Sequence, residues 1–191
     1  MIDLIKFYID LGFWHVLHLE GLDHFFFIVT LVIPFGLKDF KKLIIWTTLF
    51  TIGHTLSLVG NFYAKIYFSS YWIEILIPVT IALSALSLLF KKKNSLPSND
   101  FFPALITFVF GVIHGLGFGR YFSMLVSDDE VSLSLFSFAL GVEFSQIVIV
   151  FLTLVVTALV TYLFKNSRKN WEFLIGAMVL SKSLSMIFER I

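Results

Sequence analysis

Ionisable side chains are concentrated in one short stretch beside a strongly apolar segment. Residues 15–24, HVLHLEGLDH, contain three of the five histidines in the chain, and the apolar run 25–35 follows directly. That run is too short to cross a bilayer alone, because a transmembrane helix needs about 20 apolar residues. A spanning helix must therefore begin near Phe13 and carry Glu20 and Asp23 into the membrane. Ionisable groups at that depth cost about 2.5–3.5 kcal/mol each on insertion scales, which makes this stretch a candidate for function.

The composition is that of an integral membrane protein. Of the 191 residues, 58% are hydrophobic and 14% are charged, and the mean hydropathy is +0.93, whereas soluble domains have about 25% charged residues. The expected partner is the lipid bilayer, and the net charge of +1 gives no reason to expect a nucleic acid. Because the chain has no cysteine, a metal site would have to use nitrogen and oxygen ligands.

Apolar runs separated by hydrophilic loops predict an all-α, polytopic membrane protein with a single domain over residues 1–191. A short amphipathic helix at residues 1–12 is expected to lie at the membrane interface. Six transmembrane helices are predicted at residues 13–35, 43–63, 72–90, 101–118, 132–164 and 171–190. The loops after the first, third and fifth spans contain nine Lys or Arg residues, against four on the other side. By the positive-inside rule both termini are extracytoplasmic, in what we expect to be a bacterial inner membrane.

Five ionisable side chains from five spans fall at a similar depth in the membrane. Counting about 1.5 Å of rise per residue places each of them roughly 16–20 Å from one face of a hydrocarbon core about 30 Å thick. The five are His24, His54, His114, Glu143 and Lys182. Because such side chains are costly in the membrane unless they pair with one another or face a cavity, we expect them to share a single cavity.

Four motifs, in chain order, resemble the HupE/UreJ family of membrane proteins. They are Asp23-His24 eight residues after His15, then FTIGHT (50–55), HGLGF (114–118) and GVEFSQ (141–146). The family pattern has serine where this chain has Thr55, which keeps the hydroxyl, and His18 lies outside the pattern. The resemblance covers nearly the whole chain, and the matching residues are His15, Asp23, His24, His54, His114, Glu143 and Gln146. Family members encoded beside hydrogenase and urease genes are regarded as nickel or cobalt permeases.

The first hypothesis is a permease for a divalent transition metal, with nickel or cobalt favoured by the resemblance. Imidazole and carboxylate suit Zn, Ni, Co or Fe(II), and the absence of thiolate favours release of the ion. Asp23 would bind the ion or hold a histidine in its orientation, and Glu143 would complete the ligand shell or take a proton. His15 would capture the ion near the outer mouth, and Lys182 would be an internal counter-ion, gate or coupling charge. The main ligands would be three histidines from different spans, His24, His54 and His114.

Two other hypotheses use the same residues. In an intramembrane zinc-dependent hydrolase, three histidines, or two and a carboxylate, would leave one metal position open for an activated water. Glu143 or Asp23 would be the general base, and the oxyanion could be bound by a hydroxyl of Thr51, Thr55 or Ser57. In a non-catalytic accessory protein the polar layer would be purely structural. The permease and the hydrolase require bound metal, and the accessory protein does not.

Overall fold

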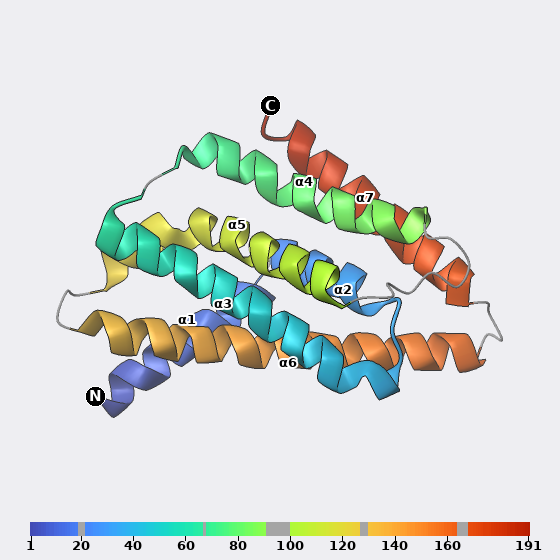
Figure 1. The fold of residues 1–191 in the computed structure, drawn as a ribbon, viewed down its shortest axis with the longest axis horizontal. Coiled ribbons are helices and arrows are strands. Elements are labelled where there is room, and N and C mark those ends of the chain that lie inside the picture. The colour runs from blue at the N-terminus through green and yellow to red at the C-terminus, as the bar shows by residue number, and fades with distance from the viewer. Residues whose placement is uncertain (19–21, 67, 91–99, 127–129, 164–167) are drawn as a thin grey trace.

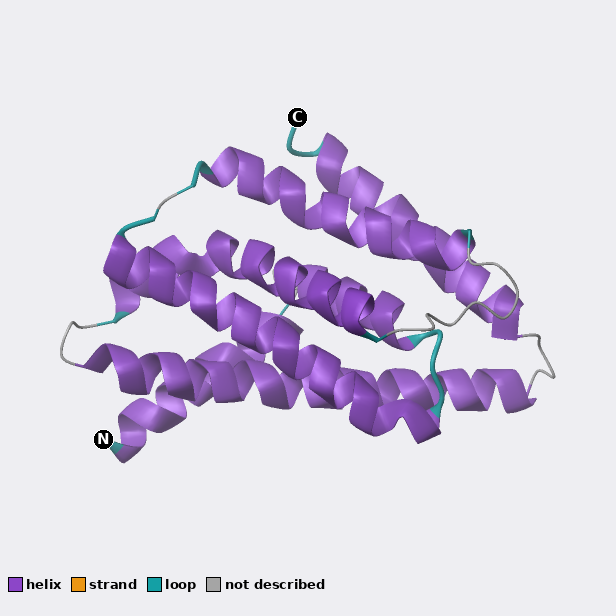
Figure 2. Cartoon of the chain, in the orientation of Figure 1, coloured by secondary structure: helices purple, strands orange, loops and turns teal. Residues whose placement is uncertain are grey.

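The structure, a computed structural model, describes the chain except residues 19–21, 67, 91–99, 127–129 and 164–167. Its described residues form α-helices and one 3-10 turn, with no strand among them (Figures 1 and 2). In chain order these elements are α1 (Ile2–Leu17), α2 (Leu22–Val32), η2 (Leu37–Asp39), α3 (Phe40–Ala64), α4 (Ser70–Leu89), α5 (Phe101–Leu125), α6 (Val131–Leu163) and α7 (Arg168–Phe188). The prediction of an all-α protein is therefore confirmed.

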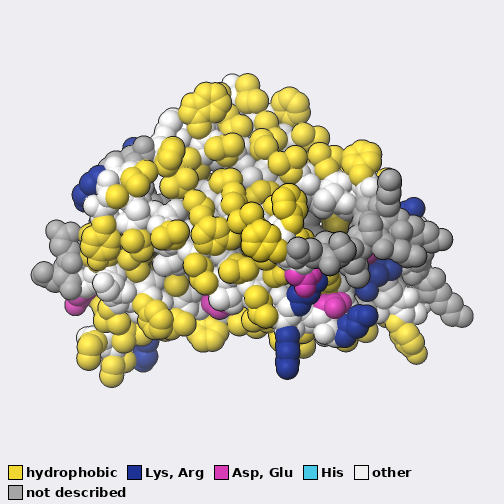
Figure 3. Space-filling model, in the orientation of Figure 1, with side chains coloured by type: hydrophobic (Ala, Val, Ile, Leu, Met, Phe, Trp, Pro, Cys, Tyr) yellow, Lys and Arg dark blue, Asp and Glu magenta, His cyan; other side chains and the backbone are white. Residues whose placement is uncertain are grey.

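The long helices run back and forth along one axis of the molecule (Figure 1). Each of the helices α3 to α7 is long and apolar enough to cross a membrane, and α1 and α2 qualify together as one bent span. The face drawn in Figure 3 is covered mostly by hydrophobic side chains, as expected for contact with lipid. Together these features define a polytopic membrane protein with up to six spans.

The first span differs from the straight helix expected at residues 13–35. Helix α1 already begins at Ile2, and the chain leaves the helical conformation at His18, whose backbone is extended (φ −70°, ψ 157°). Helix α2 then starts at Leu22 with its axis inclined by 68° to that of α1. Asp23 lies in the first turn of α2, where the helix dipole favours a negative charge. Non-helical backbone at membrane depth is tolerated where it lines a cavity or is buried in protein.

Helices α1 and α6 pack closely because glycines lie at their contact. A Cβ atom added to Gly12 would approach the backbone oxygen of Phe138 to less than 3.0 Å, and one added to Gly141 would do the same to Ile9. Small residues allow such close approach, and in lipid the packing itself holds helices together. The contact at Gly12 also positions His15, which follows one turn later on α1.

Helices α3 and α5 are joined in the same way. A Cβ atom added to Gly111 would collide with the backbone of Phe50, and one added to Gly115 with the backbone of His54. Because Gly115 follows His114 directly, this contact places the two histidines at the same level of the bundle. The GxxxG spacing of residues 111–115 therefore serves close helix packing.

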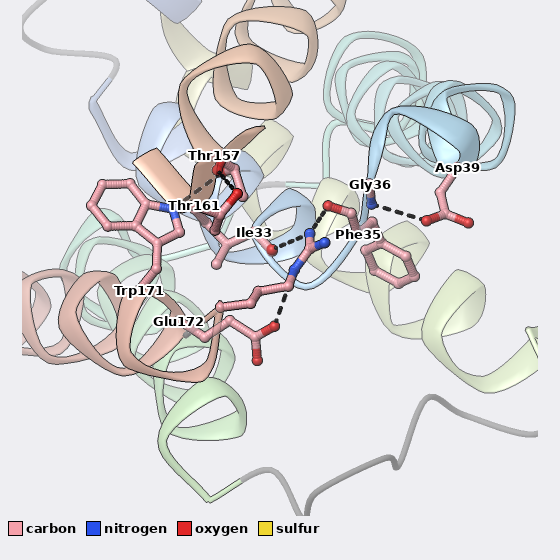
Figure 4. A network of polar contacts seen from close by, with 9 residues as sticks. Ile33, Phe35, Gly36, Asp39, Thr157, Thr161, Trp171 and Glu172 are labelled. Atoms are coloured by element: carbon pink, nitrogen blue, oxygen red, sulfur yellow. Dashed lines mark hydrogen bonds and ion pairs between the residues drawn. The ribbon is translucent and has the colours of Figure 1, made fainter. Parts of the chain in front are cut away.

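One basic side chain binds the chain at the C-terminal end of α2. Arg168, at the start of α7, donates hydrogen bonds through Nη2 to the backbone oxygens of Ile33 (3.0 Å) and Phe35 (Figure 4). These two carbonyl groups follow the last residue of α2, where the chain offers no helical donor, and the guanidinium supplies one. Trp171 donates through Nε1 to Thr157 Oγ1 (3.2 Å) and ties α7 to α6.

The glycine contacts lead to a stability prediction. Gly141→Ala should destabilise the protein by about 1–3 kcal/mol, because the added methyl group forces α1 away from α6. Thermal unfolding in detergent, followed by tryptophan fluorescence, should show a Tm lower by at least about 2 °C. The matched control is Gly60→Ala on α3, where an added Cβ would meet nothing closer than 3.8 Å. Equal Tm values for the two variants would contradict this account of the packing.

Candidate metal site

Four imidazole rings from four helices lie in contact inside the bundle. The centroid of the His24 ring is 4.9 Å from that of His15, 5.5 Å from that of His54 and 5.1 Å from that of His114. Three of the four rings are almost completely buried: His24 and His114 are 2% exposed and His54 is 1% exposed. We call these residues the histidine cluster: His15 on α1, His24 on α2, His54 on α3 and His114 on α5.

Most ring nitrogens of the histidine cluster have no hydrogen-bond partner in the described part of the chain. The unpartnered buried atoms include Nε2 of all four rings and Nδ1 of His54. A buried polar atom left unsatisfied costs about 1–3 kcal/mol. One ligand atom from each of His15, His24 and His54 lies within 4.8 Å of the other two. Neutral imidazole nitrogens in such an arrangement are suited to bind a transition metal ion.

Hydrogen bonds on the opposite ring nitrogen orient two of the four histidines. His24 Nδ1 donates to Asp23 Oδ1 (2.8 Å), and His114 Nδ1 donates to the backbone oxygen of Phe110 (2.7 Å). Both oxygens accept the hydrogen, so Nδ1 carries it and Nε2 keeps a free lone pair. This arrangement is typical of metal-binding histidines, whose second nitrogen donates to a carboxylate or a carbonyl. Asp23 therefore holds His24 and does not join the converging ligand atoms.

A cavity of about 500 Å³ opens beside the histidine cluster. Its lining includes His15, His24 and His114, and we call it the histidine cavity. Two acidic side chains line it as well, Asp23 from α2 and Glu74 from α4. Glu74 lies in no sequence motif that would predict it, and only the packing of α4 brings it to this cavity. A cation in this cavity would meet two carboxylates on its way to the imidazoles.

The structure places Glu143 apart from the histidine cluster. Its two carboxylate oxygens accept hydrogen bonds from Thr48 Oγ1 (2.6 Å) and Thr51 Oγ1 (2.5 Å) of α3. Gln146, one turn along α6, is fully buried, and its Oε1 lies 3.1 Å from Thr51 Oγ1. The α6 carboxylate thus faces two threonines of α3 that lie about one and two turns before His54. That Glu143 completes the ligand shell or takes a proton stays a prediction.

Other residues expected at the site lie in different surroundings. Lys182 is on the exposed side of α7, which packs mainly against α4, and it does not line the histidine cavity. Ser57 donates to the backbone oxygen of His54 (2.7 Å), so its hydroxyl is used within α3. Thr55 Oγ1 is buried and unpartnered. His15, expected as a capture residue at the outer mouth, lies within the cluster itself.

The fold and the site together define a polytopic helical membrane protein with a buried histidine cluster. The family model described as HupE / UreJ protein matches residues 1–190. The chain therefore belongs to the HupE/UreJ family, as the four motifs indicated. Comparison with curated proteins and with solved structures gave no match.

The bond between Asp23 and His24 leads to a prediction about affinity. Asp23→Ala should weaken nickel or cobalt binding about 10–100-fold, because His24 loses the acceptor that orients its ring. Asp23→Asn keeps an acceptor oxygen and should lose less. Isothermal titration calorimetry on the detergent-purified protein measures the effect, with Asp10→Asn on the exposed side of α1 as the control. Unchanged affinity in Asp23→Ala would contradict this role.

Proposed function

We propose that this protein is a permease for a divalent transition metal ion, with nickel or cobalt favoured by family membership. The observation that carries the proposal is the histidine cluster, in which ring nitrogens are buried and unpartnered beside a cavity. In this proposal the metal ion is the substrate. It enters through the histidine cavity, past Asp23 and Glu74, and is bound by the imidazoles.

The spacing of the ligand atoms supports transient binding. Tetrahedral coordination with metal–nitrogen bonds of about 2.0–2.1 Å requires nitrogens about 3.3 Å apart. The ligand atoms of His15, His24 and His54 lie up to 4.8 Å apart. The three side chains must therefore draw together when the ion binds and move apart when it leaves. Such a change between two arrangements is what a carrier needs, whereas a structural metal site is closed.

The break between α1 and α2 supports transport as well. Secondary transporters bind their substrates near the bilayer midplane at discontinuous helices. Here the break directly precedes Asp23 and His24, so the ligand-bearing end of α2 is also a helix end. The likeness to secondary transporters concerns the helix architecture alone, and it points to the same place in the fold as the imidazole ligands.

Hydrolysis by the same site has weaker support. A zinc hydrolase needs a general base beside the metal-bound water. The two carboxylates considered for that role are engaged elsewhere, Asp23 with His24 and Glu143 with Thr48 and Thr51. Of the three hydroxyls considered for an oxyanion, Thr51 contacts Glu143 and Ser57 contacts its own helix. The hydroxyl of Thr55 is unpartnered, but Thr55 does not line the histidine cavity.

Uptake of nickel and cobalt into proteoliposomes tests the proposal. The wild-type protein should transport at least one of the two ions, and His54→Ala should lose at least about 90% of that uptake and most of the metal binding, because His54 contributes a ligand nitrogen. Leu56→Ala, two residues farther along α3 and 55% exposed, is the matched control and should transport normally.

Two other results would overturn the proposal. One zinc ion per chain, tightly held and lost in His54→Ala, without any metal uptake, would favour the hydrolase. No metal bound by the wild-type protein, even after loading with nickel, cobalt and zinc, would favour a structural polar network.

A further inference from the structure

A second large cavity lies between α2, α3, α4 and α5. It also has a volume of about 500 Å³, and its lining includes the rings of Phe27, Phe35, Trp46 and Phe110 together with the hydroxyls of Thr30, Ser84 and Thr107. We call it the aromatic cavity. None of its lining residues belongs to the histidine cluster, and the proposed function assigns it no role.

The two cavities meet at one layer of aromatic rings. Phe27 follows His24 by one turn on α2, and Phe110 precedes His114 by one turn on α5. The Phe27 and Phe110 rings lie 5.2 Å apart, in an edge-to-face arrangement. His24 and His114 line the histidine cavity, and Phe27 and Phe110 line the aromatic cavity. The partition between the cavities is therefore about one helical turn thick, or ~5.4 Å.

A third phenylalanine ties this layer to the histidine cluster. The Phe50 ring stacks on Phe27 with centroids 5.2 Å apart and lies 5.1 Å from the His114 ring. Phe50 is 1% exposed and Phe27 is 2% exposed. Contacting apolar rings leave no room for an ion with its water shell, and an apolar constriction of this kind blocks conduction by excluding water.

A charged pair lies beside two of the rings that line the aromatic cavity. The Lys42 ammonium is 4.8 Å from the centroid of the Trp46 ring and 5.3 Å from that of Phe35, and both rings line the cavity. Lys42 forms an ion pair with Asp100, and the two side chains are 29% and 59% exposed. A partly exposed ion pair belongs at the aqueous surface. The aromatic cavity therefore extends from the phenylalanine layer toward a water-facing end of the bundle.

We propose that Phe27 and Phe110 form the closed gate of the permeation path, and that the aromatic cavity is the vestibule on the membrane face opposite the histidine cavity. The proposal rests on the proposed function and adds the route by which the ion leaves. His24 and Phe27 share one face of the short helix α2. When ligand atoms up to 4.8 Å apart close around an ion, His24 draws α2 with it and moves Phe27 relative to Phe110. Metal binding and gate opening are thereby coupled through one helix.

Single cysteines test the position of the two cavities, because the chain has none of its own. Ser84→Cys places a thiol in the aromatic cavity, and Tyr121→Cys places one in the histidine cavity. A charged, membrane-impermeant methanethiosulfonate, applied to either face of oriented vesicles, should label each thiol from one face only, and the two faces should differ. The lipid-facing control is Leu159→Cys, which is 51% exposed on α6 and should react only with a membrane-permeant maleimide.

Two labelling results would contradict the proposal that the aromatic cavity is a vestibule on the opposite membrane face. Labelling of both thiols from the same face would place both cavities on one side of the membrane. Reaction of Ser84→Cys with the permeant maleimide alone would show a pocket filled by lipid. Because labelling needs no metal, these results are independent of whether the protein transports nickel or cobalt.

The gate is tested by Phe110→Ala in the Ser84→Cys background. The charged reagent should then label Ser84→Cys from both faces. From the formerly closed face, the labelling rate should be at least about tenfold higher than in Ser84→Cys alone. Metal affinity should stay within about twofold, because the His114 hydrogen bond uses the backbone oxygen of residue 110. Phe110→Tyr should restore one-sided labelling, and Phe102→Ala, at a position 66% exposed on the same helix, is the control.

Labelling that stays one-sided in both Phe110→Ala and Phe27→Ala would show that these rings are not the gate. Loss of folding in one variant leaves the other variant as the test. Labelling of the two single-cysteine thiols from opposite faces, without any nickel or cobalt uptake, would instead contradict the proposed function and leave the arrangement of two opposite vestibules standing.

Discussion

The structure depends on one constraint, which is that polar groups inside a bilayer must find partners within the protein. The helical backbone satisfies itself, and most buried hydroxyls donate to carbonyls of their own helix, as Thr30 does to Phe27 and Thr80 to Ile77. The carboxylate of Glu143 is satisfied by two threonines of α3. Against this background the unpartnered nitrogens of the histidine cluster stand out. They are the buried groups whose chemistry is best matched by a metal ion.

Much of this arrangement could be predicted from the sequence because helical rise is regular. Counting residues along each span places His24, His54 and His114 at one depth, and the structure brings their rings together. The same count cannot predict rotation about the helix axis or the choice of neighbouring helix. Glu143 has the right depth but faces α3 threonines, and Lys182 has the right depth but lies on the exposed side of α7. Axial position is thus a local property, and facing direction is set by tertiary packing.

The bend between α1 and α2 escaped prediction for a related reason. Hydropathy averages over a window of about 19 residues, so an apolar segment interrupted by a few polar residues still predicts one span. Gly12 and Gly141 hold α1 closely against α6, so the direction of α1 depends on tertiary packing that hydropathy does not report. As a result His15 belongs to the cluster although it precedes His24 by nine residues.

Two rigid pairs and one short helix make up the site. Glycine contacts lock α1 to α6 and α3 to α5, so His15, His54 and His114 sit on elements that cannot separate without losing close packing. Helix α2 has only 11 residues; the break precedes it, and Arg168 holds the carbonyls that follow its last turn. Because α2 carries both a ligand, His24, and an aromatic ring of the partition, Phe27, a small rotation about its Arg168 end would change the ligand geometry and the partition together. Because His24 and Phe27 lie one turn apart on the same face of α2, this coupling follows from the α2 sequence itself.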